Sequence, residues 1–189
     1  MQVAVPASPY VAADGTITIY PEETLVFRAA GPPDGPLTLV FVREGVSQAP
    51  KNIPPSDASF QGDAKTTVVH DPKTGENVYG IYAGSRFIEG GTAEEHLKGE
   101  PEGTVIVSYH QAVGRPDMVL RVDHNLPGML KYDAFMERLS PSGPTAAEAT
   151  STCPVHTVVA GQETWPYPLG AISMRNFRLL KEDAPFNCD

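Results

Sequence analysis

The sequence contains no apolar run approaching the roughly 20 residues of a membrane-spanning helix, so it predicts no transmembrane segment. Basic residues are scarce, with 14 Lys and Arg against 23 Asp and Glu, and the formal charge is −9. A chain of this charge repels phosphate backbones, which argues against nucleic acid as a partner. At 189 residues, the expected organisation is one domain, residues 1–189, whose core needs no metal.

Sequence signatures of catalysis and cofactor binding are also lacking. The chain has no Gly-x-Ser-x-Gly elbow, and no two histidines stand at metal-ligand spacing. The glycine-rich run 84–91 lacks the Lys-Ser or Lys-Thr of a phosphate-binding loop. The paired acids Glu22-Glu23 and Glu94-Glu95 are typical of solvated faces or caps. We therefore expect no cofactor and no metal.

Proline is abundant, at 19 residues. Because proline fixes φ and removes a ladder donor, this density argues against long helices and favours short strands joined by turns. The segment 129–139 fits either a strand or a helical stripe, and its β neighbours favour a strand. Alternating or apolar runs predict the other strands at 16–20, 24–28, 37–42, 66–70, 77–82, 104–109, 117–122, 155–159 and 172–180.

About ten short strands with frequent turns predict an all-β fold with minor α content, an antiparallel β-sandwich with one or two short helices. The strand lengths resemble those of immunoglobulin-like or jelly-roll sandwiches, but the immunoglobulin Cys…Trp…Cys spacing is absent. This resemblance is architectural and implies no activity. Thr92 and Glu95 match a capping box and predict a helix at 92–98. The segment 47–65 is predicted to be a long surface loop and 141–152 a small-residue linker.

The two cysteines, Cys153 and Cys188, both have turn-forming neighbours. An even count in loop settings favours a disulfide that closes the C-terminal segment 153–188. Cys153 could instead act as a catalytic thiol with His156. A proline follows Cys153 directly, however, and no helix N-terminus is apparent that would lower the pKa of its thiol. The disulfide is therefore the preferred interpretation.

The N-terminus, Met1 to Pro9, has neither a charged n-region nor an apolar h-region, so it is not a signal peptide as written. Together with the predicted disulfide, this indicates a periplasmic or secreted protein whose signal peptide has been replaced by an initiator methionine. The alternative is a cytoplasmic protein with two unrelated thiols.

Histidine and acidic residues offer a weaker signal. Asp123-His124 and His70-Asp71 are sequence neighbours, but adjacent strand residues point to opposite faces and rarely form a working acid–base pair. A metal site assembled across strands from His70, His110, His124 and an acid is a further alternative. Strand register decides whether such residues meet.

The most suggestive cluster is the run 163–169, which holds the only tryptophan. Glu163, Trp165 and Tyr167 are the candidate ligand-binding residues, because rigid amphipathic aromatics suit a protein or carbohydrate ligand. The structural interpretation, which we favour, places Trp165 in the core.

These observations favour an exported, non-enzymatic binding or structural module. A binding module should expose an aromatic surface, and a structural subunit should expose an apolar edge or patch. The alternative is a secreted hydrolase or metal-binding protein, with His and acidic side chains meeting from several strands.

Overall fold

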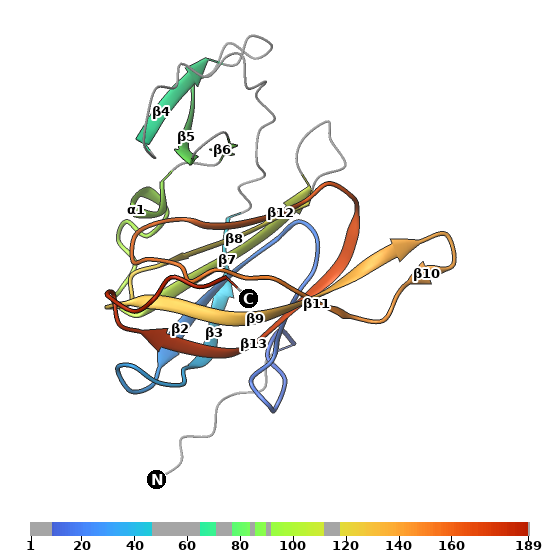
Figure 1. Ribbon diagram of the computed structural model, residues 1–189, viewed down its shortest axis with the longest axis horizontal. Helices are drawn as coiled ribbons and strands as arrows, with labels where there is room; N and C mark the ends of the chain where they lie inside the picture. The colour runs from blue at the N-terminus through green and yellow to red at the C-terminus, as the bar shows by residue number, and fades with distance from the viewer. Residues whose placement is uncertain are drawn as a thin grey trace.

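The computed structural model describes residues 9–46, 65–70, 77–83, 86–89, 92–111 and 118–188, with the backbone alone described between 65 and 89. The regular secondary structure of these residues is almost entirely β, with 54% strand and 3% helix (Figure 1). The elements are β1 (Ile17–Ile19), β2 (Glu23–Ala30), β3 (Thr38–Glu44), β4 (Lys65–His70), β5 (Asn77–Ala83), β6 (Arg86–Glu89), α1 (Ala93–His96), β7 (Thr104–Gln111), β8 (Met118–His124), β9 (Met129–Ser140), β10 (Gly143–Pro144), β11 (Glu148–Thr150), β12 (Gly161–Trp165) and β13 (Leu169–Leu180).

Two antiparallel sheets pack against each other (Figure 1). In the first, which we call the β9 sheet, the strand order is β1-β13-β9-β10, and β11 also pairs with β9. In the second, the β7 sheet, the order is β12-β8-β7-β2-β3. Strands β4, β5 and β6 form a separate small antiparallel sheet. The predicted all-β sandwich with minor α content is confirmed.

The main core lies between the two sheets and follows from the two-residue period of the strands. On β7, Val105, Val107 and Tyr109 point into this core, whereas Ile106 lies on the opposite face. Large side chains that fill the core include Phe27, Leu120, Tyr132, Ile172 and Met174.

A second, smaller apolar cluster lies on the outer face of the β7 sheet. It consists of Val26, Ile106, Ala93, Leu97 and Ala160, so it joins α1 to the sheet. The capping box predicted for α1 is present: Glu95 N donates to Thr92 Oγ1 (3.0 Å), and Thr92 N donates to Glu95 Oε2 (2.9 Å). A helix this short depends on its cap and on packing.

Most of the predicted strands are confirmed, including 129–139, which is strand β9. The prediction of a strand at 155–159 is wrong. Val155 makes only an isolated bridge to Leu130, and the chain then turns, because Val158 has a left-handed backbone (φ 50°). The β-branched residues suggested a strand, but here the chain crosses between the sheets.

The segment 141–152, predicted as a linker, folds back along β9 and contributes the short strands β10 and β11. Strands β6 and β12 were not predicted. The predicted loop 47–65 lies outside the described residues except for Lys65, which begins β4.

The predicted disulfide between Cys153 and Cys188 is present, and no cysteine is free. It attaches the C-terminal residues to the segment that leads into β12. In the described part of the chain, no helix has the length and apolar character needed to cross a membrane.

Candidate functional site

A turn at residues 156–159, here called the valine turn, presents two valines at the surface. Val159 N donates to His156 O (3.2 Å), which closes the turn, and Val158 N donates to His124 O (2.9 Å). Val158, its third residue, adopts φ 50°. Glycine or asparagine is usual where a turn requires positive φ, because a β-branched side chain crowds the backbone there.

The rest of the fold holds the valine turn in place. Before it, Val155 and Leu130 exchange two backbone hydrogen bonds, each 2.8 Å long. After it, Gly161 packs so closely that a Cβ there would lie 2.3 Å from Val155 Cγ2. The strained conformation is therefore fixed from both sides, as such residues require.

Three exposed apolar side chains belong to the valine turn or contact its first residue. Val158 is 49% exposed, Val159 47% and Phe186 54%. The Phe186 ring stacks on His156, the first residue of the turn, with ring centroids 5.7 Å apart and planes 3° from parallel. We call Val158, Val159 and Phe186 the tip surface.

Two further contacts hold Phe186 against the turn. His156 Nδ1 lies 2.6 Å from Glu182 Oε1, and the Cys153–Cys188 disulfide links the chain on either side. The tip surface is thus assembled from two segments that are distant in the sequence. Its parts are stiffened before any partner arrives, which reduces the entropy cost of association.

The candidate ligand-binding residues do not converge on an exposed surface. Trp165 is buried in the core, and its Nε1 donates to Thr150 Oγ1 (3.3 Å), so the favoured structural interpretation of Trp165 is confirmed. Tyr167 is partly buried, with the Arg138 guanidinium 5.3 Å from its ring centroid. Glu163 is partly buried, and its Oε1 accepts from Cys153 N (3.4 Å). Their role in ligand binding stays a prediction.

Among the described residues, no three metal-ligating side chains come together. His110 and His124 lie on opposite faces of the β7 sheet. His124 is buried, with Nε2 at 2.7 Å from Val155 O and Nδ1 accepting from Leu126 N (3.2 Å). Burial lowers the pKa of His124, which favours the neutral ring. The side chain of His70 lies outside the described residues.

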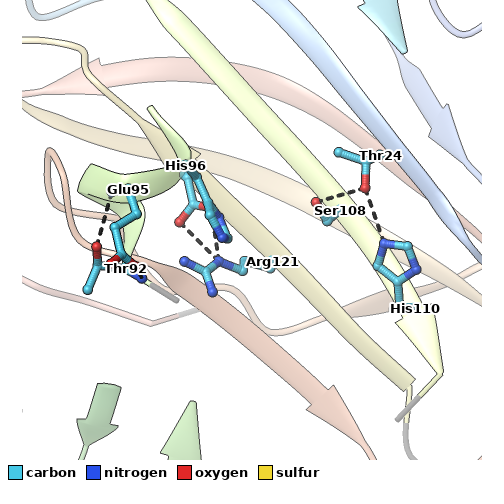
Figure 2. Close-up of polar contacts among 8 residues, drawn as sticks. Thr24, Thr92, Glu95, His96, Ser108, His110 and Arg121 are labelled. Carbon is cyan, nitrogen blue, oxygen red and sulfur yellow. Dashed lines mark hydrogen bonds and ion pairs between the residues drawn. The ribbon is translucent and has the colours of Figure 1, made fainter. Parts of the chain in front are cut away.

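The outer face of the β7 sheet does bring titratable groups together (Figure 2). We call Glu22, Thr24, His96, Ser108, His110, Arg121 and Asp123 the outer polar cluster. Its first half joins α1 to β8: His96 Nδ1 lies 2.7 Å from Asp123 Oδ2, and Arg121 Nε donates to both Asp123 oxygens (3.1 and 2.9 Å). Asp123 and Arg121 are buried.

The pKa of Asp123 is set by opposing effects. Burial alone would raise it, but the hydrogen bond from His96 and the charge of Arg121 outweigh burial and lower the pKa below its usual range. Asp123 is therefore a carboxylate at neutral pH, buried together with its counter-charge.

The second half of the outer polar cluster is a chain of hydroxyl, imidazole and carboxylate groups. Thr24 Oγ1 donates to Ser108 Oγ (3.1 Å) and lies 3.2 Å from His110 Nε2. His110 Nδ1 lies 3.3 Å from Glu22 Oε2. Thr24, Ser108 and His110 are buried, whereas Glu22 is exposed.

Sequence reasoning missed this cluster because its members come from distant strands. Thr24 and Ser108 are paired across β2 and β7, and Ser108 and Arg121 across β7 and β8. The sequence did exclude one pair. Asp123 and His124 are adjacent on a strand and, as expected, point to opposite faces and bind different partners.

Comparisons of this chain with protein-family models, with curated proteins and with solved structures found no match.

Proposed function

We propose that this protein is an exported binding module that docks onto a folded protein partner through the tip surface. One observation carries the proposal: Val158 holds a left-handed backbone while half of its side chain remains exposed. A residue in such a conformation costs about 1–3 kcal/mol, and an exposed valine recovers little of that by burial. A partner that buries the valines accounts for their presence.

The chemistry around the tip surface favours a protein partner. Glu182 and Asp183 are exposed in the same C-terminal segment as Phe186, and acidic groups disfavour docking on an anionic lipid surface. A carbohydrate face would use exposed tryptophan or tyrosine rings, whereas the tip surface offers two valines and Phe186, whose ring is stacked on His156. The matching partner has a shallow apolar pocket with a basic rim.

Export is part of the same proposal. A disulfide persists in oxidising compartments such as the periplasm or the extracellular space, and the Cys153–Cys188 bond supports that placement. The bond also fixes the segment that carries Phe186, so oxidation and docking are linked.

Photo-crosslinking tests the docking proposal. A benzophenone side chain at position 159, in cells that produce the protein, should give one discrete adduct with a second protein. The same group at Leu139 is the matched control, because Leu139 is similarly exposed but lies at the end of β9. Position 139 should give no such adduct.

Val158→Asn separates docking from folding. Asparagine tolerates positive φ, so this variant should be more stable than the natural chain by about 1 kcal/mol. It should nevertheless lose the adduct formed from position 159, because the apolar contact is gone. Equal adducts from positions 159 and 139, or an adduct that survives Val158→Asn, would contradict the proposal.

A further inference from the structure

We propose that Ser108 is an activated nucleophile that cleaves small carboxylic esters, with its proton passing through Thr24 to His110. The assignment is independent of docking at the tip surface, because it uses the outer face of the β7 sheet and shares no residue with the tip surface. It rests on the geometry of Glu22, Thr24, Ser108 and His110.

Strand register brings these four residues together. Thr24 on β2 is the direct partner of Ser108 on β7, and His110 lies two residues further along β7, hence on the same face. Glu22 immediately precedes β2, and its N donates to Tyr109 O (2.7 Å). Its carboxylate reaches back to β7, where Oε1 accepts from Gln111 N (3.1 Å) and Oε2 faces His110.

Glu22 is held in an unusual conformation for this contact. Its backbone has φ 70°, which is uncommon for a residue other than glycine. Glu22 is also largely exposed, so burial does not compensate for the strain. Backbone strain that places a carboxylate beside an imidazole is typical of functional sites.

The proton path follows from the chemistry of the groups. A carboxylate beside Nδ1 favours the tautomer whose Nδ1–H donates to Glu22, and the Nε2 lone pair then faces Thr24. Hydroxyl hydrogens rotate freely, so Ser108 can donate to Thr24 while Thr24 donates to His110, without movement of any heavier atom. This satisfies the requirement for a nucleophile linked to a base that a third group orients.

A buried positive charge lies on the same face of the β7 sheet as the nucleophile. Arg121 is the direct partner of Ser108 on β8, so both side chains emerge on the same face (Figure 2). Its Nε donates to both Asp123 oxygens, so the guanidinium is turned toward His96 (Figure 2), and we assign it no contact with the reacting ester. Ser108 is 8% exposed, which suits a small ester better than a polymer.

The reaction balances with water as the only co-reactant. Ser108 Oγ bonds to the ester carbonyl carbon while its proton moves through Thr24 to His110 Nε2. The carbon–alkoxy bond then breaks, and the alcohol leaves with that proton. Water cleaves the acyl-Ser108 ester by the same path in reverse, which releases the carboxylic acid and restores the Ser108 hydroxyl.

The test uses diisopropyl fluorophosphate, which phosphorylates activated serines and releases fluoride. Native protein should be modified once per chain at Ser108, as located by peptide mass spectrometry, and urea-unfolded protein should not react. Exposed Ser142 is the internal control and should stay unmodified. p-Nitrophenyl acetate should give a burst of p-nitrophenolate stoichiometric with protein.

Variants distinguish activation of the Ser108 hydroxyl from a purely structural role of these residues. Ser108→Ala should abolish labelling, and His110→Gln should slow it by about 10²-fold or more, the usual contribution of a general base. Glu22→Gln alters an exposed side chain and should keep the fold, which a thermal melt verifies; it should slow labelling about tenfold, less than removal of the base itself.

Absence of label on Ser108 in the native protein, or label at Thr24 instead, would overturn the assignment. Labelling that is unchanged in both His110→Gln and Glu22→Gln would also overturn it. In either case the four residues would act only as a hydrogen-bonded clamp between β2 and β7.

Discussion

Replacing Asp123 by asparagine should remove the strongest polar link between α1 and the sandwich. The substitution keeps the size of the side chain but removes its charge, so Arg121 stays buried without a counter-ion and only one side-chain oxygen remains to accept from Arg121 and His96. Breaking a buried ion pair on one side typically costs about 3–5 kcal/mol. We expect Asp123→Asn to lower the free energy of unfolding at pH 7 by that amount.

Urea unfolding monitored by the fluorescence of Trp165 measures this loss. The pH dependence gives a second readout. Because the pKa of Asp123 in the folded chain lies below its unfolded value of about 3.9, its contribution is complete above that value and is lost as pH falls through the folded pKa. The natural chain should therefore lose stability below about pH 4 more steeply than the variant does.

Asp133→Asn is the matched control. Asp133 also accepts hydrogen bonds, from Asn176 (2.7 Å) and Arg178 (3.1 Å), and the Asn176 hydrogen bond is the main cause of its lowered pKa. It lies near the surface, however, where an ion pair contributes about 0–1 kcal/mol. If Asp123→Asn costs no more than Asp133→Asn, the link between α1 and β8 has little energetic value and our account of it is wrong.

Three further outcomes are expected. Trp165→Ala should cost about 3–5 kcal/mol in urea unfolding, because it leaves a cavity in the core, and the natural tryptophan should emit at short wavelength and resist iodide quenching. Thiol titration of denatured, unreduced protein should find no free thiol, and Cys188→Ser should lower stability by up to about 4 kcal/mol, the loop-closure value for this separation. Thr92→Ala should cost about 1 kcal/mol through loss of the capping box, with faster amide exchange confined to α1; a global effect would contradict this.

Much of the fold could be predicted because its signals are local. The alternation in Thr16–Tyr20 predicted strand β1, and the capping box at Thr92 predicted helix α1. The proline density predicted short strands rather than long helices. Each of these signals depends only on neighbouring residues in the sequence. The disulfide was predicted from the even number of cysteines and the turn-forming residues beside each. Such features need no knowledge of which strands lie side by side.

The outer polar cluster could not be predicted because it depends on pairing between distant strands. Thr24 and Ser108 are 84 residues apart, and a register shift of one residue would move Ser108 into the core. The prediction of a strand at the valine turn was wrong for the opposite reason. Its β-branched residues favour a strand locally, but the chain turns at Val158 where it passes from β11 in the β9 sheet to β12 in the β7 sheet.

The central position of β13 has a consequence for how the chain matures. This strand, near the end of the sequence, lies between β1 and β9. A chain that emerges N-terminus first from a ribosome or a secretion channel has β1 available early, yet β1 must wait for almost the whole polypeptide before it can pair. Such long-range pairing slows folding. Synthesis or transport can therefore finish before the native state becomes accessible, and truncation before Leu169 would leave β1 without its strand partner and β9 with only the short strands β10 and β11 as strand partners.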